Sequence, residues 1–289
     1  MKSLLIIALT LLPACELIKK LPLPDVLKPK LPERPAEPSL PEAPKPEPKP
    51  EIKTCVDTKL DPTKPGPYKI KTTKLGKVTI IEPVTDGKCK KVISHYSNGT
   101  GAMCLFYLEV NRHLASHGYM ATCYESPETG SGEPCLKAYR AVKDRPDVLK
   151  DHLLSIGHSQ GGNASVHCQY KMQSRYPEVK VVSAGSQPAW GMNWSRYATD
   201  IPKIGSPIAV FSGDADTIVP HSWVQRGVRR MKGEHYYYQC KPRCNHMNSR
   251  RWHKSFALAF SNGWLLDDDD AKAVFKDFPA GGNWRNMLR

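Results

Sequence analysis

The sequence lacks several features that would point to other classes of protein. It contains no internal repeat, and the apolar run at residues 4–12 is too short to span a bilayer. The formal net charge is +14 and the isoelectric point about 9.3, but the short basic runs are not interleaved with aromatic residues that could stack on bases. Cys240-x3-Cys244-x-His246 has no second half with zinc-like spacing. We therefore expect no nucleic-acid partner, no metal and no cofactor.

The start of the chain is typical of an exported protein. Lys2 precedes the apolar run, and small residues follow it up to Cys15, as in a signal peptide. The ending Leu-Pro-Ala-Cys resembles a bacterial lipobox, which implies that residues 1–15 are a lipoprotein signal peptide and that Cys15 carries lipid. The alternative is an ordinary signal peptide with an incidental cysteine. A proline-rich segment follows at once and favours the lipoprotein.

The segment between this signal and the folded part is rich in proline, lysine and glutamate. Proline fixes φ, and mixed charges leave little to bury, so we expect residues 16–54 to be a disordered, polyproline-like tether. Residues 55–289 are expected to form one folded domain. Nine cysteines are present, and eight remain if Cys15 is lipidated. An even number in an exported chain indicates disulfides, with Cys240 and Cys244 as close candidate partners.

Short apolar segments alternate with amphipathic ones in this domain. Strands are expected at residues 77–84, 91–96, 119–124, 153–157, 179–183, 208–211 and 235–239, and helices at residues 103–117, 133–142 and after Pro146. Leu105, Leu108 and Leu114 are expected on the inner face of the first helix. The alternation implies right-handed βαβ crossovers, and so an α/β fold with a largely parallel sheet.

Ser159 lies in the motif G-x-S-x-G, directly after an apolar strand and before a helix-like stretch. A sharp strand-to-helix turn needs glycine on both sides of the serine, because the serine backbone is strained and the turn is crowded. Such a turn exposes the hydroxyl at the end of the strand. The pattern therefore predicts a nucleophile at Ser159. The preceding residue, His158, is expected to pack within the turn.

A serine hydroxyl becomes an effective nucleophile when a histidine, oriented by a carboxylate, removes its proton. Asp214 and Asp216 both follow the strand at residues 208–211, and an acid at that position lies at the same sheet edge as the serine. An aspartate in this kind of loop can instead cap backbone amides. Spacing alone leaves both aspartates open as the orienting acid.

His246 is the expected base because it lies in a polar loop after the last strand. Three other histidines compete with it. His221 lies too close behind the acid to reach back around it, His235 opens a strand, and His253 falls within an expected helix. A disulfide between the cysteines that flank the loop would hold the base in place.

Taken together, these residues resemble the α/β-hydrolase superfamily, and within it the dienelactone-hydrolase-like and bacterial cutinase or polyester-hydrolase group. The G-H-S-x-G-G turn of that group matches residues 157–162, and its G-x-x-D-x-x-x-P segment matches Gly213, Asp216 and Pro220. The resemblance covers residues 70–278. It implies an α/β-hydrolase fold, with helices on both faces of a largely parallel central sheet, and selects Asp216 as the orienting acid.

The same resemblance extends to weaker loop motifs. An oxyanion hole needs two backbone N–H donors, and Gln160 supplies one because it follows the nucleophile. The glycine-bearing loop after the early strand resembles the oxyanion loop of the group and implies Thr100 as the second donor, with Gly99 as its rival. Trp190 and Trp194 are candidate substrate-binding residues, for which core packing is the alternative.

We therefore expect a lipid-anchored serine hydrolase of the bacterial cell envelope, monomeric and facing the periplasm or the exterior. Its partners would be a small or polymeric ester substrate and, through the lipid anchor, the membrane. The expectation that the substrate is an ester and not an amide rests on the resemblance, because the same triad serves both reactions. A peptidase or acyltransferase with this triad, and a non-catalytic envelope-binding lipoprotein, are the alternatives.

Overall fold

The computed structural model describes residues 53–190, 203–205, 207–276 and 283–286. Cys15, the expected lipidation site, and nearly all of the expected tether lie outside these residues. No helix in the described ranges is long and apolar enough to cross a membrane.

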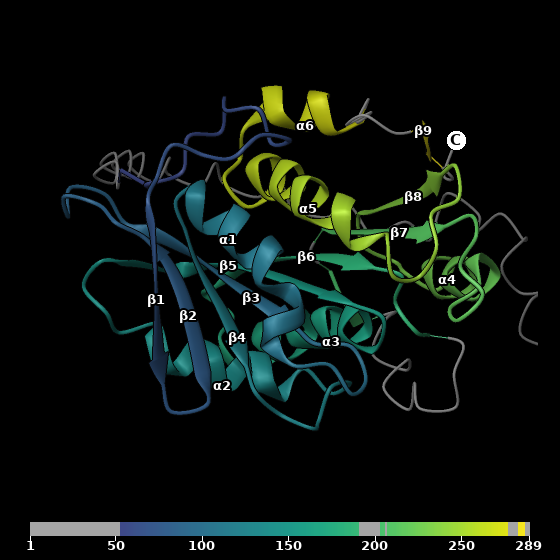
Figure 1. The fold of residues 1–289 in the computed structure, drawn as a ribbon, viewed down its shortest axis with the longest axis horizontal. Helices are drawn as coiled ribbons and strands as arrows, with labels where there is room; N and C mark the ends of the chain where they lie inside the picture. The colour runs from purple at the N-terminus through teal and green to yellow at the C-terminus, as the bar shows by residue number, and fades with distance from the viewer. Residues whose placement is uncertain (1–52, 191–202, 206, 277–282, 287–289) are drawn as a thin grey trace, which may run out of the picture. The chain divides into compact units, whose positions relative to one another are not determined.

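Within the described chain, nine strands form one sheet in the order β1-β2-β4-β3-β5-β6-β7-β8-β9 (Figure 1). All pairs from β4 through β8 are parallel, whereas β1, β2 and β9 are added antiparallel. The predicted α/β fold with a largely parallel sheet is confirmed. The strands are β1 (Ile70–Leu75), β2 (Val78–Pro83), β3 (Lys91–Ser97), β4 (Tyr119–Tyr124), β5 (Val148–His158), β6 (Lys180–Ser186), β7 (Ile208–Gly213), β8 (His235–Lys241) and β9 (Asn283–Asn286).

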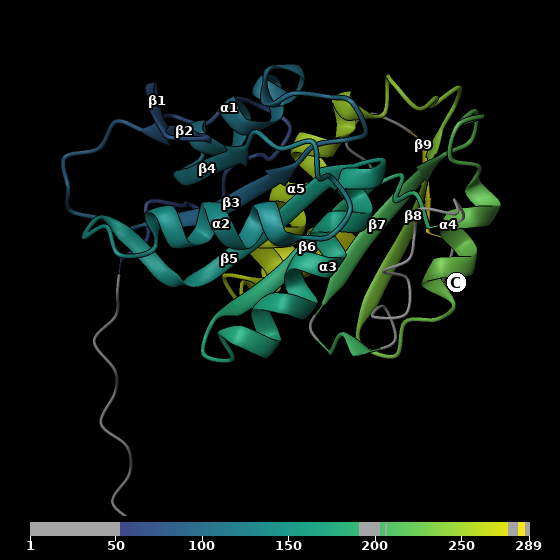
Figure 2. The same ribbon diagram turned by 90° about the horizontal axis from the view of Figure 1, so that it is seen from below.

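Helices cover both faces of the sheet. On one face α5 packs against both α1 and α6, and on the other α2 lies beside α3. Figure 2 shows α2 and α3 in front of the strands, with α5 behind them. The helical segments are η3 (Cys104–Tyr107), α1 (Leu108–Ser116), α2 (Glu133–Val142), α3 (Gln160–Arg175), α4 (His221–Val228), α5 (Arg250–Trp264) and α6 (Asp269–Lys276).

The central strands are apolar on both faces, as expected for parallel strands covered by helices. Along β5, Leu153 points into the cluster shared with α2 and α3, and Leu154 into the cluster shared with α1 and α5. On the α5 side, Phe256 and Phe260 are one helical turn apart and both contact Phe275 of α6. Each of these fully buried rings contributes about 1.5–3 kcal/mol relative to exposure.

Two local predictions are wrong. The stretch after Pro146 is not helical, because β5 begins at Val148. The first residues of β5 pair with the start of β3, and the register of the two strands shifts after Val92. Leu105 does not face inward and is 65% exposed. Residues Cys104–Tyr107 form a separate 3₁₀ turn before α1. A 3₁₀ turn has three residues per turn, so it shifts the phase of the side chains that precede the α-helix.

Four disulfides are present among the described residues, so the disulfide prediction is confirmed. They join Cys55–Cys89, Cys104–Cys123, Cys135–Cys168 and Cys240–Cys244. The second ties η3 to β4, and the fourth joins the end of β8 to the loop that contains His246. The segment from the end of β3 to η3 and the loop that contains His246 both line the cleft at the carboxyl edge of the parallel strands.

Candidate active site

Ser159 occupies the tight turn between β5 and α3. Its backbone has φ 59° and ψ −123°, outside the regions that residues other than glycine usually adopt, which confirms the strained turn predicted from the sequence. A Cβ on Gly157 would approach the Gly161 carbonyl oxygen to 2.0 Å, and one on Gly161 would approach the Ser97 carbonyl oxygen equally closely. Only glycine fits at either position. Strain of about 1–3 kcal/mol is typical of functional turns of this kind.

The fold brings the turn after β5 beside the loop after β3. These two strands are neighbours in the sheet, but the chain leaves β3 through α1 to β4 on one side and leaves β5 through α3 to β6 on the other. Ligands bind at such a switch point, outside the carboxyl ends of the strands. Ser159 therefore lies where an α/β sheet offers a binding crevice.

The acid and the base meet at the same edge. Oδ2 of Asp216 lies 2.8 Å from Nδ1 of His246. The other carboxylate oxygen accepts hydrogen bonds from the backbone N–H groups of Ile218 and Val219, at 2.9 and 2.8 Å. The Asp216 side chain is fully buried and that of His246 is 9% exposed. A carboxylate fixed in this way places the proton of His246 on Nδ1 and leaves Nε2 free to accept one.

Asp214 has a different role in the structure. Its carboxylate accepts hydrogen bonds from the backbone N–H groups of Cys244 and Arg243, at 2.8 and 3.3 Å. It therefore caps backbone amides of the loop that leads to His246, which is the alternative considered for this residue. The carboxylate that contacts the imidazole is that of Asp216.

The other candidate histidines are engaged elsewhere. Nδ1 of His221 contacts the Ser212 hydroxyl at 3.0 Å, and Nε2 of His253 contacts the Ala184 carbonyl in the core at 2.9 Å. His235 contacts a backbone carbonyl two residues away. None of the three lines the cavity at Ser159.

Ser159 and His246 line one cavity of about 340 Å³. Three exposed apolar side chains form part of its rim: Phe106, Ile218 and Met247 are 56%, 52% and 55% exposed. Thr100 and Arg250 also line the cavity. Exposed apolar side chains that gather at a cleft, instead of being scattered, indicate a surface for apolar ligands. The sequence did not point to any of these three apolar residues, because they come from three segments that lie far apart in the chain.

One hydrogen bond distinguishes the two candidate oxyanion donors in the loop after β3, Gly99 and Thr100. The backbone N–H of Gly99 donates to the Tyr107 hydroxyl at 3.1 Å and is not free for a substrate. The Thr100 hydroxyl donates to the Gln160 side chain at 2.8 Å, which joins the loop after β3 to the start of α3. Thr100 also lines the cavity with Ser159. Of the two candidates in this loop, the Gly99 N–H is therefore engaged elsewhere, and the role of Thr100 stays a prediction.

Trp190, one of the two candidate substrate-binding tryptophans, does not line this cavity. Trp190 is buried and packs with Val224 and Val228 of α4. A Cβ on Gly227 would meet the Trp190 ring at 2.0 Å, so the ring lies directly on that helix. Trp190 is a core residue, which corrects the substrate-binding expectation. Trp194 lies outside the described residues.

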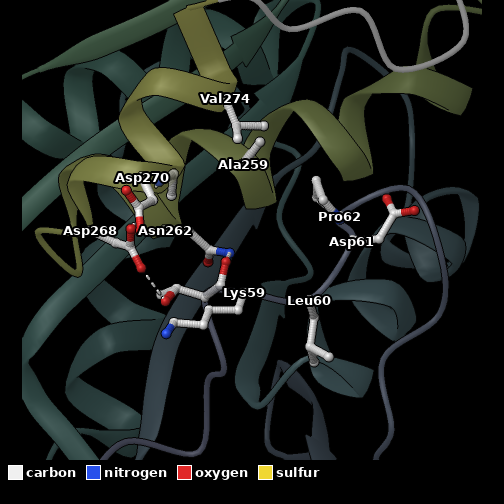
Figure 3. Close-up of a pocket in the computed structure, with 11 residues that line it drawn as sticks. Lys59, Leu60, Asp61, Pro62, Ala259, Asn262, Asp268, Asp270 and Val274 are labelled. Atoms are coloured by element: carbon white, nitrogen blue, oxygen red, sulfur yellow. Dashed lines mark hydrogen bonds between the residues drawn. The ribbon is translucent and has the colours of Figure 1, made fainter.

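A second cavity, of about 440 Å³, lies between residues 58–62 and helices α5 and α6 (Figure 3). Two hydrogen bonds join residues of its lining: the Thr58 hydroxyl bonds Asp268, and the Asn262 amide donates to the Thr58 carbonyl at 3.4 Å. Its lining contains no serine, cysteine or histidine. Of these two cavities, only the one at Ser159 holds a serine together with a histidine.

The chain matches none of the protein-family models and none of the curated proteins with which it was compared.

Proposed function

We propose that the protein is a serine carboxylic-ester hydrolase with an α/β-hydrolase fold, acting through an acyl-enzyme. One observation carries the proposal. A serine in a strained turn shares a cavity with a histidine whose Nδ1 is bonded to a buried aspartate. Nucleophile, base and orienting acid are the elements that acyl transfer needs, and they are recognised by geometry instead of chain position.

The proposed reaction follows from the roles of these atoms. Nε2 of His246 takes the proton of the Ser159 hydroxyl, whose oxygen attacks the ester carbonyl. The N–H groups of Gln160 and Thr100 hold the oxyanion, and losing one such donor typically costs about 2.7–4 kcal/mol. His246 then protonates the leaving alcohol, and Asp216 stabilises the imidazolium that forms in between. A water molecule, deprotonated by His246, then attacks the acyl-enzyme. His246 returns this proton to the Ser159 oxygen as the bond to the acyl group breaks and the acid is released.

The rim of the cleft supports esters with an apolar acyl group. The cavity is open to solvent, and exposed aliphatic, aromatic and thioether side chains line it, together with the side chains of Thr100 and Arg250. A short-chain p-nitrophenyl ester is therefore a suitable first substrate, and the activity should rise as the acyl chain extends over the rim.

The test compares Ser159→Ala with Ser165→Ala as a matched control. Ser165 is buried in α3, and its hydroxyl bonds the Gly162 carbonyl, away from the cavity. We expect wild type and the control to release p-nitrophenol and to label with a fluorophosphonate, and Ser159→Ala to do neither. A folded wild type that neither turns over esters nor labels would instead support a non-catalytic binding protein.

We also propose that the protein is a lipoprotein of the bacterial envelope, anchored through Cys15. Four disulfides support export to an oxidising compartment. Cys15→Ala should move the protein from the membrane fraction to the soluble fraction. Unchanged fractionation would reject the anchor without affecting the proposed catalysis.

A further inference from the structure

His158, the residue before the nucleophile, bridges two loops of the cleft. It is 3% exposed, with Nε2 2.8 Å from the His246 carbonyl oxygen and Nδ1 3.3 Å from the Tyr107 hydroxyl. A carbonyl only accepts hydrogen bonds, so the ring proton is assigned to Nε2, and Nδ1 accepts from tyrosine. Burial, together with the neighbouring His246, lowers the pKa of His158 to about 3. The ring therefore stays neutral and keeps one donor and one acceptor.

Tyr107 continues this connection to the oxyanion loop. Its hydroxyl accepts from the Gly99 N–H at 3.1 Å while it donates to His158. The tyrosine ring is fixed by stacking on Tyr96, with 4.4 Å between ring centroids. A chain of three hydrogen bonds thus runs from Gly99 through Tyr107 and His158 to the backbone of His246. Every donor points the same way along this chain, an arrangement in which each bond polarises the next.

A second anchor of the same base loop is Gln187, whose amide oxygen also lies 3.3 Å from Nε2 of His158. The Gln187 amide lies 3.3 Å from the Asn245 carbonyl and accepts from the Ser249 hydroxyl at 2.7 Å. Gln187 is fully buried, with φ 46°. Strained, buried residues of this kind persist where the surroundings fix them, often at functional sites. Two consecutive backbone carbonyls of the base loop, at residues 245 and 246, are therefore held by buried side chains.

We propose that His158 is a positioning residue that sets the catalytic base relative to the nucleophile and couples the base loop to the oxyanion loop through Tyr107. This inference rests on the proposed ester hydrolysis. His158 acts through the backbone of His246, and it leaves the transfer of the Ser159 proton to the His246 ring. The base must come within about 2.6–3.2 Å of the serine oxygen for that transfer. A displacement of about 1 Å costs on the order of 10²-fold in rate.

The two ring nitrogens can be tested separately by amide substitutions. In His158→Gln the longer side chain carries an N–H to the position of Nε2 and keeps the bond to the His246 carbonyl. In His158→Asn the amide oxygen replaces Nδ1 and keeps the bond to Tyr107, but the side chain is too short for His246. His158→Leu removes both bonds.

We expect His158→Leu to lose about 10²-fold in kcat, with KM changed by less than about threefold, because orientation and not binding is altered. His158→Gln should recover most of this loss and His158→Asn little of it. Tyr107→Phe should lower kcat about tenfold and should add almost nothing to His158→Leu, because both interrupt one chain. Tyr119→Phe is the matched control, because its buried hydroxyl bonds Ser261 of α5 and does not line the cavity at Ser159.

The experiment measures kcat, KM, melting temperature and the fraction labelled by fluorophosphonate for each variant of the full chain, which separates positioning from general destabilisation. Equal kcat in the folded Gln and Asn variants would overturn the proposal. It would also be overturned if kcat fell in every variant, Tyr119→Phe included, in proportion to the loss of melting temperature. This comparison holds even if His158→Leu does not fold. An inactive wild type would reject the proposed function itself. An active wild type whose His158 variants keep the wild-type kcat would reject only the role of His158.

Discussion

Replacing Asp216 by asparagine tests the acid–base pair most selectively. The substitution keeps the shape of the side chain, and one amide oxygen can still accept from the N–H groups of Ile218 and Val219. The amide NH₂ then faces Nδ1 of His246, where the carboxylate oxygen lies 2.8 Å away in the wild type. A donor at that position forces the histidine proton onto Nε2, so the ring can no longer accept the serine proton.

The size of the effect follows from this change of tautomer. An aspartate-to-asparagine substitution in a serine protease triad loses about 10⁴-fold in kcat, or about 5.4 kcal/mol at 1.36 kcal/mol per tenfold. Because the Asp216 side chain is fully buried, water cannot take its place, and we expect a loss of the same order here. Asp214→Asn is the matched control, because that carboxylate bonds only backbone N–H groups; it should stay within about tenfold of wild type.

Both variants are assayed for p-nitrophenyl butyrate hydrolysis at pH 8, with circular dichroism to verify folding and a fluorophosphonate to count active sites. The reasoning is refuted if folded Asp216→Asn stays within tenfold of wild type, or if Asp214→Asn loses as much activity as Asp216→Asn. In the second case Asp216 would not be the only acid on which the orientation of His246 depends.

Two further predictions concern stability. Burial opposes ionisation of Asp147, but hydrogen bonds from Arg145 and Lys91 outweigh it and hold its pKa at about 2. Because this pKa is lower than in the unfolded chain, the ionised carboxylate stabilises the fold above about pH 4. The contribution is lost as the pH falls towards 2. Melting temperature should therefore drop over that interval, and less so in Asp147→Asn; equal slopes would contradict the assignment. Phe275→Ala should lower the free energy of unfolding by about 3–5 kcal/mol, because the ring is fully buried among aromatic residues. Its exposed neighbour provides the control, since Val274→Ala should change stability by less than about 0.5 kcal/mol in urea titrations; similar losses in both would contradict the core packing.

The parts of the fold that could be predicted are those that local chemistry determines. The strand expected at residues 119–124 coincides with β4, and the helix expected at residues 133–142 coincides with α2. The turn at Ser159 was predictable because its glycines leave no sterically possible alternative. The contact between Asp216 and His246 was also within reach, because acid and base each follow a strand of one parallel sheet. The catalytic roles of these residues stay predictions.

The remaining features depend on contacts that sequence spacing does not encode. Tyr107 reaches His158 across 51 positions in the chain, and no motif marks a tyrosine near the start of a helical segment as a hydrogen-bonding partner. Leu105 fits a helical pattern until the 3₁₀ turn changes its phase. Trp190 follows the strand beside the nucleophile, yet it turns towards α4 because Gly227 leaves room for the indole there. In each case tertiary packing decided between two local possibilities.

The acyl-enzyme can be detected directly by mass spectrometry of the protein mixed with a p-nitrophenyl ester and quenched in acid during turnover. We expect a mass increase equal to the acyl group, mapped to the peptide that contains Ser159, and no such adduct in His246→Ala. Turnover by wild type without any acyl adduct, or with the adduct on another residue, would show that Ser159 is not a nucleophile activated by His246.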